Sequence, residues 1–421
     1  MIAASLAPLF LLLTFLRQNV ILTLAVIVGL IHVYLATNSS AEYMIQDLWF
    51  TLDREVLLSI PMFMFAGVIM SRGSIANRLV RVMTALTSRL PGGLGVGTIM
   101  ALAMFSSISG SGIVTMMAIG GLMFPALVNR GYGVHYALGV LASGGTLGII
   151  IPPSILMILY GFSTETSVTD MFRAGWGPGL AMVAVLSIYT IIRQRRLPTT
   201  PIDFREVASA LRHGITAIMM PVILLTGIYT GYFTVTEAAA LSLFYALVVE
   251  VIIHRELGFE EIYEIGIETV KLLGGLMPLL AFANSFNVIL DYEGVPQALL
   301  EWAQVYIGSA WALLIAVNLL LLIAGALMDE SSAILILAPL LAPLGAAYGF
   351  DPVHFGIIVI VNLQIGYVMP PVAINVIIAA TIFKQSFGTV CRAVMPFIGL
   401  MLLVLLLTIL FPQLSLYFAG R

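Results

Sequence analysis

Long apolar runs separated by short polar segments extend along almost the whole chain. Runs of membrane-spanning length include 20–36, 182–192 with its flanks, and 398–411, and about 20 apolar residues are enough to cross a bilayer as a helix. In the first half the pattern predicts helices at 2–16 and 19–37, an amphipathic stretch at 40–54 and a span at 57–71. In the second half the matching segments are 220–234, 237–253, 258–272 and 274–290.

The helix-breaking residues of the first half recur in the second half with a shift of 218 positions, a pattern typical of secondary transporters. The matched positions are Pro125, Gly131, Gly148, Pro152, Pro153 and Pro178 with Pro343, Gly349, Gly366, Pro370, Pro371 and Pro396.

Each half then has an apolar stretch interrupted by a short polar segment, the predicted tip of a hairpin. A helix broken at tandem prolines follows, and then a final span at 177–192 or 395–410. The tips are Ser109-Gly-Ser-Gly and Leu327-Met-Asp-Glu, and the breaks are Ile151-Pro-Pro and Met369-Pro-Pro. The predicted fold class is therefore an all-α integral membrane protein of two inverted-topology repeats with re-entrant hairpins and broken helices.

Charge supports the inversion independently of spacing. If each interrupted stretch doubles back, each half crosses the membrane five times, and an odd number of crossings orients the halves oppositely. The connector at 72–92 carries four arginines and no acid, whereas its counterpart at 290–310 carries three acids and no basic residue. The positive-inside rule places the first in the cytoplasm and the second outside, with both termini extracytoplasmic. The predicted division is 1–196 for the first repeat, 197–219 for a basic cytoplasmic linker and 220–421 for the second repeat.

Composition fits a membrane protein without enzymatic activity. Hydrophobic residues make up 61% of the chain and charged residues 9%, against roughly 25% charge in a soluble domain. The single Cys391 excludes an internal disulfide framework, and the five histidines show no metal-binding spacing. A net charge of −3 gives no reason to expect a nucleic-acid partner. We interpret Met1–Phe15 as a membrane helix, because it lacks the basic start and cleavage site of a signal peptide.

The four interruptions lie at apparent membrane depth, where unwound backbone persists only if it lines a cavity or meets a ligand. Tandem prolines free carbonyl oxygens one turn earlier, and Ser106 and Ser109 add hydroxyl oxygens. Neutral oxygens of this kind suit Na⁺, and the N-termini of half-helices favour an anionic substrate. The alternative is that these positions are only kinks packed between helices.

Several polar residues within the apolar runs are candidates for substrate binding. Asp329 and Glu330 stand inside an apolar run, where ionisable groups are functional candidates; the alternative is a turn at the water interface. Ser143, Thr146 and Ser154 on the first broken helix, and Asn362, Gln364 and Asn375 on the second, could bind substrate or could join helices. Glu237 heads a helix, where an acid is expected to act as a cap.

At these motifs the chain resembles the large membrane subunit of tripartite ATP-independent periplasmic (TRAP) transporters, the DctM-like family, over essentially its whole length. The likeness rests on the runs beginning at Ile60-Pro-Met-Phe-Met-Phe-Ala-Gly, Ile108-Ser-Gly-Ser-Gly, Gly148-Ile-Ile-Ile-Pro-Pro-Ser-Ile, Thr234-Val-Thr-Glu, Gly349-Phe-Asp-Pro-Val-His and Asn362-Leu-Gln-Ile-Gly-Tyr-Val-Met-Pro-Pro-Val. The resemblance implies a Na⁺-driven, elevator-type importer of a small organic acid in a bacterial or archaeal cytoplasmic membrane. It also implies two partners, a small DctQ-like membrane subunit and a soluble extracytoplasmic substrate-binding protein.

The resemblance also implies which residues hold the ions and the substrate. The first Na⁺ site comprises Ser106, Ser109, Gly148, Ile151 and Pro152, and the second comprises Gly325, Gly366, Met369 and Pro370. The expected substrate-binding residues are Ser154, Asp329, Asn362, Gln364 and Asn375. The second break has Met369 where a hydroxyl residue is common in the family, so the second Na⁺ site loses a side-chain ligand.

Two other functions remain open from the sequence. A self-sufficient Na⁺/dicarboxylate symporter differs from the first hypothesis in needing no binding protein. An intramembrane serine protease would use Ser109 with His135 or His354 as its base, which must lie within hydrogen-bond reach.

Overall fold

The structure, a computed structural model, describes residues 20–35, 41–199 and 201–421, and the elements in these residues are helices, with no strand among them. Nine of the helices described are long and apolar enough to cross a membrane. The predicted helix at 2–16 lies outside the described residues.

In the first repeat the elements are α2 (Val20–Leu30), η1 (Ile31–Leu35), α3 (Ala41–Leu52), η2 (Glu55–Leu58), α4 (Ser59–Arg72), α5 (Ile75–Thr87), α6 (Gly93–Ser109), α7 (Gly112–Asn129), α8 (Val134–Gly145), η3 (Thr146–Ile149), α9 (Ile155–Thr164) and α10 (Val168–Arg193).

In the second repeat they are α11 (Phe204–Tyr229), α12 (Val235–Leu247), η4 (Val248–Ile253), α13 (Phe259–Tyr292), α14 (Val295–Tyr306), α15 (Ala310–Leu327), α16 (Glu330–Ala347), α17 (Pro352–Gly366), α18 (Ile374–Ile382), α19 (Phe387–Leu410) and α20 (Gln413–Ala419).

Both predicted hairpins and both predicted breaks are present. α6 ends at Ser109 and α7 begins at Gly112, while α15 ends at Leu327 and α16 begins at Glu330. Gly110 at the first tip has a φ of 60°, in the left-handed region where a glycine costs least. The helices α8 and α17 stop immediately before or within the Gly-to-Pro-Pro segments, and α9 and α18 resume beyond them. The fold class predicted from the sequence is confirmed.

Two predicted boundaries are wrong. The segments 258–272 and 274–290 form one helix of 34 residues, α13, because membrane helices tolerate an interior proline such as Pro278. The segment 197–219 is not a linker throughout, because α11 begins at Phe204. The side chain of Asp203 accepts hydrogen bonds from the backbone N–H groups of Arg205 and Glu206 and so starts that helix.

Capping explains another helix start that the sequence predicted. The Glu237 carboxylate accepts from the backbone N–H of Thr234, and the Thr234 hydroxyl accepts from the backbone N–H of Glu237. This reciprocal pair is a capping box, which satisfies two otherwise free N–H groups at the start of α12. The structural role predicted for Glu237 is confirmed.

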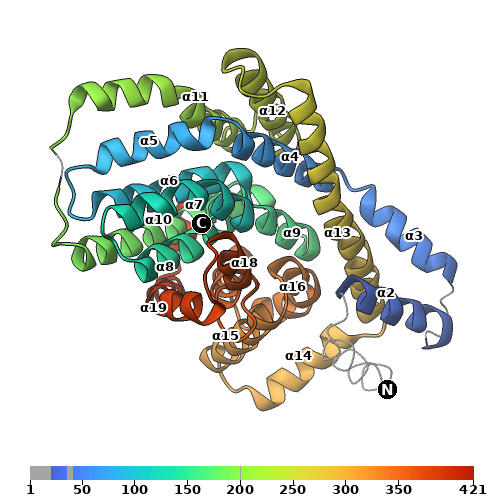
Figure 1. Ribbon diagram of the computed structural model, residues 1–421. Helices are drawn as coiled ribbons and strands as arrows, with labels where there is room; N and C mark the ends of the chain where they lie inside the picture. The colour runs from blue at the N-terminus through green and yellow to red at the C-terminus, as the bar shows by residue number, and fades with distance from the viewer. Residues whose placement is uncertain (1–19, 36–40, 200) are drawn as a thin grey trace.

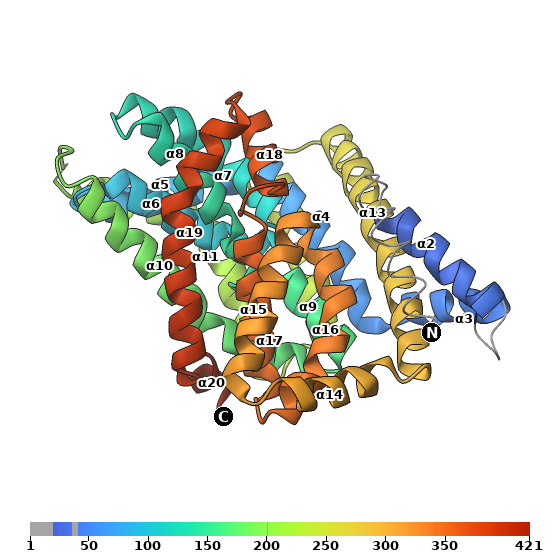
Figure 2. The same ribbon diagram turned by 90° about the horizontal axis from the view of Figure 1, so that it is seen from below.

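Most of the described helices form two packed groups, and α5 lies between them, packed against α6 and α11, while α14 packs against α13 and α16. The peripheral group consists of α2–α4 and α11–α13: α12 packs against α4, and α13 packs against α2, α3 and α4. The hairpin group consists of α6–α10 and α15–α20. In both views α2 and α3 lie beside α13, on the opposite side of the molecule from α10 (Figures 1 and 2).

Packing within the hairpin group follows the repeat. In each repeat the first arm of the hairpin packs against the first part of its own broken helix, α6 against α8 and α15 against α17. The second arm packs against the far part of the other repeat's broken helix, α7 against α18 and α16 against α9. The two repeats therefore interlock at the breaks.

Candidate ion and substrate site at the broken helices

The first hairpin closes tightly onto the first break. A Cβ added at Gly148 would lie 2.9 Å from Cβ of Ser106, and one added at Gly112 would lie 3.4 Å from the carbonyl oxygen of Gly145. The hydroxyls of Ser109 and Thr115 lie 2.7 Å apart, and both residues are buried. The structure thus brings Ser106 against Gly148, with Ser109 at the hairpin tip.

The remaining residues of the first break are held by backbone and packing contacts. The N–H of Ile151 donates to the carbonyl of Leu147 over 2.9 Å, while its side chain lies against Gly179 of α10. Pro152 is buried and joined to Pro153 by a cis peptide bond. The hydroxyl of Ser154 donates to the carbonyl of Ile149 over 2.7 Å. Ile151 can therefore offer the site only its backbone.

The second hairpin meets the second break through two glycines. A Cβ added at Gly366 would lie 2.8 Å from Cα of Gly325, so the two backbones touch. The N–H of Met369 donates to the carbonyl of Gly366 over 2.9 Å, and Pro370 follows with a cis bond to Pro371. These four predicted residues form one contiguous group. Met369 and Pro370 are partly exposed.

Asp329 begins α16 as its N-cap. Its carboxylate accepts from both the backbone N–H and the hydroxyl of Ser332. The neighbouring Glu330 has a buried Oε2 that no hydrogen bond reaches in the part of the chain that the structure describes. The second tip therefore differs chemically from the first, which carries only hydroxyls and glycines.

The three predicted amides point to three different places. The amide of Gln364 donates to the hydroxyl of Thr146 over 3.2 Å. Asn362 donates to the side-chain oxygen of Asn318 on α15 over 2.6 Å, and Asn375 donates to the carbonyl of Ala142 on α8 over 2.7 Å. All three side chains are fully buried, and in each the amide oxygen has no hydrogen-bond partner among the described residues.

The Gln364–Thr146 hydrogen bond joins residues that are 218 positions apart, which is the shift between the two repeats. Residues equivalent by an internal two-fold relation can touch only where they lie close to its axis. Thr146 in turn donates to the carbonyl of Ser143 over 2.7 Å. This pair therefore marks the centre of the interface between the repeats.

Sequence reasoning missed three residues of this region. The hydroxyl of Thr115 is hydrogen-bonded to Ser109, and the side chain of Asn318 is hydrogen-bonded to Asn362. Gly67 of α4 lies close to the first hairpin tip, since a Cβ added at Gly67 would be 2.8 Å from the Cα of Ser109. Asn318 could have been found, since it is a lone amide in the apolar run of α15. Gly67 ends the run from Ile60 that carries the family resemblance, but nothing in the sequence placed Gly67 or Thr115 at the hairpin tip.

The contacts of Ser109 and His354 do not support the protease hypothesis. The hydroxyl of Ser109 is engaged by Thr115, and the Nδ1 atom of His354 lies 2.7 Å from the hydroxyl of Ser415. No predicted site residue lines any of three cavities in the described structure, of about 590, 480 and 280 Å³.

The chain is similar in sequence to known permeases over most of its length. A family model described as "Tripartite ATP-independent periplasmic transporter, DctM component" matches residues 7–414. The C4-dicarboxylate TRAP transporter large permease protein DctM of Pseudomonas aeruginosa is 36% identical over 391 residues, covering 92% of each chain. The ectoine TRAP transporter large permease protein TeaC of Halomonas elongata is 35% identical, covering 89% of each chain. The isethionate TRAP transporter permease protein DctMQ of Oleidesulfovibrio alaskensis is 37% identical over 90% of this chain and 60% of its own length.

Solved structures share the fold at lower identity. The Alcanivorax borkumensis YdaH transporter aligns with a TM-score of 0.65 and 16% identity, covering 97% of this chain and 98% of that one. Neisseria gonorrhoeae MtrF aligns with a TM-score of 0.62 and 13% identity, covering 88% and 83%. These structures show the fold alone. The family model and the sequence relatives establish that the chain belongs to the DctM family, the large permease component of tripartite ATP-independent periplasmic transporters.

Proposed function

We propose that this permease imports a small organic acid by Na⁺ symport, together with a small membrane subunit and a soluble substrate-binding protein. The carboxylate assignment follows the relative named for C4-dicarboxylate, although other relatives are named for isethionate and ectoine. The proposed movement is an elevator-like displacement of the hairpin group against the peripheral group.

The observation that carries this proposal is the paired closure of a hairpin onto a helix break in both repeats. Ser106 meets Gly148, and Gly325 meets Gly366. Broken helices at membrane depth are where transporters bind ions and substrate, because unwound backbone there needs a partner.

The residues present fit Na⁺ in the chemistry of their donor atoms. At the first break the hydroxyl of Ser106 donates to the carbonyl of Ala103, which leaves its lone pairs available to a cation. The hydroxyl of Ser109 is bonded to Thr115 and also accepts from the backbone N–H of Ser111, so a cation would replace one of these contacts. At the second break only backbone oxygens come from Gly325, Gly366, Met369 and Pro370. We therefore expect the first site to bind Na⁺ more tightly than the second.

Reconstitution tests the proposal directly. Proteoliposomes containing the permease and its small subunit should take up a radiolabelled C4-dicarboxylate only with the binding protein and an inward Na⁺ gradient. Pro152→Ala and Pro370→Ala should each raise the Na⁺ concentration for half-maximal uptake about tenfold, equivalent to ~1.4 kcal/mol of binding. Pro396→Ala, which changes a proline inside the continuous helix α19, serves as the matched control.

Two results would contradict parts of this proposal. Equal Na⁺ dependence in the wild type and both break variants rejects the ion sites. Full uptake without the binding protein favours a self-sufficient symporter instead.

A further inference from the structure

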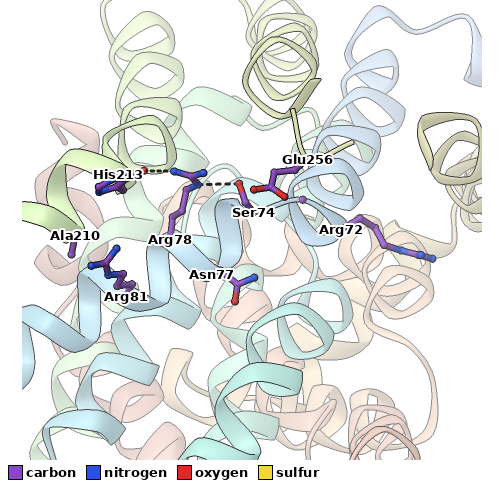
Figure 3. Close-up of a pocket in the computed structure, with 9 residues that line it drawn as sticks. Arg72, Ser74, Asn77, Arg78, Arg81, Ala210, His213 and Glu256 are labelled. Atoms are coloured by element: carbon purple, nitrogen blue, oxygen red, sulfur yellow. Dashed lines mark hydrogen bonds between the residues drawn. The ribbon is translucent and has the colours of Figure 1, made fainter. Parts of the chain in front are cut away.

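We propose that the cavity of about 480 Å³ where α4 turns into α5 binds the headgroup of an anionic, hydroxyl-bearing phospholipid such as phosphatidylglycerol. The cavity is lined by Arg72, Gly73, Ser74, Asn77, Arg78, Arg81, Ala210, His213 and Glu256 (Figure 3). This inference concerns the lipid contact of the fold and does not depend on the transported substrate.

The cavity lies where membrane-spanning segments reach water. The candidate span Glu55–Arg72 ends at it, Val235–Ile253 ends just before Glu256, and Phe259–Tyr292 begins just after. α5, which forms one wall, is amphipathic and buries Ile75, Leu79 and Val82. A lipid headgroup occupies this depth of a bilayer. The charge asymmetry of the sequence predicts that the surrounding face is cytoplasmic.

Arg78 is held in position but keeps donors free. Its Nε donates to the hydroxyl of Ser74 over 3.0 Å, and its Nη1 donates to the carbonyl of His213 over 3.2 Å (Figure 3). No carboxylate lies within 4 Å of its guanidinium in the described structure. An arginine has five N–H donors in a fixed plane, so at least three remain for a phosphate.

The other two arginines of the cavity pair with acids on neighbouring helices, and His213 is held within its own helix. Arg72 pairs with Glu268 over 2.8 Å, and Arg81 pairs with Glu206 over 2.7 Å. Nδ1 of His213 lies 2.7 Å from the carbonyl of Ser209, which assigns the ring proton to Nδ1 and leaves Nε2 free. Arg72 and Arg81 are held by their own acids, so Arg78 is the arginine of the cavity that forms no salt bridge among the described residues. The carboxylate of Glu250 accepts from the hydroxyl of Ser74, the same hydroxyl that accepts from Arg78.

Glu256 selects among anionic headgroups. Among the described residues it is the one carboxylate that lines the cavity. It would repel a bare phosphate monoester, but it can accept hydrogen bonds from hydroxyls. A phosphodiester that carries a glycerol headgroup offers one negative charge to Arg78 and hydroxyls to Glu256. A basic pocket between membrane helices is a recognised form of lipid headgroup site.

Exposed apolar side chains stand next to the cavity on one element. Ile252 and Ile253 directly precede His254, whose Nδ1 lies 3.0 Å from the hydroxyl of Ser74. Exposed apolar surface beside a polar lining is what the acyl chains of a bound lipid require, whereas a soluble anion does not need it.

Native mass spectrometry of the purified full chain, titrated with phosphatidylglycerol, tests the site. Arg78→Gln should weaken binding about tenfold, because it removes charge-assisted hydrogen bonds to the phosphate. Asn77→Asp should also weaken it, by about threefold, through charge repulsion without disturbing the Arg78 contacts. Arg89→Gln makes the same charge change as Arg78→Gln just beyond α5, away from the cavity, and should leave binding unchanged.

Headgroup competition separates the possible ligands. Phosphatidylcholine should bind more weakly than phosphatidylglycerol, and inorganic phosphate should not displace the lipid. Equal binding of the two lipids, or equal losses in Arg78→Gln and Arg89→Gln, overturns the proposal. Displacement by inorganic phosphate would show a soluble-anion site and overturn it as well.

Discussion

Asp329 at the second hairpin tip has both a capping role and a negative charge, and two different substitutions can separate these effects. Its carboxylate caps α16 through Ser332, and it also brings negative charge to the proposed substrate site. Asparagine caps a helix about as well as aspartate, whereas alanine does not, at a cost of about 1 kcal/mol.

Asp329→Asn should therefore keep the wild-type unfolding temperature in detergent but lower uptake. Asp329→Ala should lower both. The measurements are thermal unfolding and initial uptake rate in proteoliposomes. Unchanged uptake in Asp329→Asn would leave the residue with its capping role alone.

Thr146 holds the centre of the repeat interface through one hydrogen bond from Gln364. Thr146→Val removes the acceptor and leaves the buried amide of Gln364 without a partner. We expect a loss of about 1–2 kcal/mol in the free energy of unfolding, the range for such bonds between membrane helices.

Thr98→Val is the control for that loss, since the buried hydroxyl of Thr98 donates only within its own helix, to Leu94. A loss as large in Thr98→Val would mean that the contact between repeats contributes nothing specific.

At the scale of elements, glycines decide how closely the hairpins approach the breaks. Gly325 and Gly366 let α15 and α17 touch through their backbones. Neither backbone can move aside as a flexible side chain could, so Gly366→Ala forces the hairpin away from the break. The expected loss of stability is roughly 1–3 kcal/mol, the usual effect of overpacking, and Na⁺-dependent uptake should fall with it.

Gly399→Ala in α19 is the matched control, because a Cβ there meets nothing within 4 Å. It should be neutral or slightly stabilising, by about 0.5–1 kcal/mol, since alanine favours a helix. The measurements are the thermal unfolding temperature and the uptake rate of Gly366→Ala and Gly399→Ala. Wild-type behaviour of Gly366→Ala would show that the hairpin is not held against the break in the working protein.

Element boundaries were predictable where breakers are strong and paired. The Pro-Pro segments and polar tips ended helices as expected, because proline lacks an N–H and polar tips need partners at membrane depth. The single helix α13 was not predicted, since Pro278 and Gly274 look like breakers although a membrane helix tolerates an interior proline. Isolated breakers are therefore weaker signals than paired ones.

At the scale of the molecule, the inverted orientation of the repeats can be tested by labelling. In a Cys391→Ser background the chain has no cysteine, since Cys391 is its only one. Arg89→Cys and Glu293→Cys each introduce one cysteine at an exposed position, the first in the basic connector and the second in the acidic connector. A membrane-impermeant maleimide added to intact cells should label Glu293→Cys at once and Arg89→Cys only after permeabilisation. Labelling of both from the same side would refute the inverted topology.

The sequence by itself determined the matching breakers of the two halves, the breaks and the hairpins. These follow from apolar run length and from where helices must stop, which are local properties of the chain. Only the tertiary structure decided what each polar side chain does there. Asn362, Gln364 and Asn375 look alike in sequence, yet they bind Asn318, Thr146 and Ala142 on three different elements. The reason is physical: the direction of a buried side chain is fixed by which helix packs against it, and that depends on contacts between residues far apart in the chain.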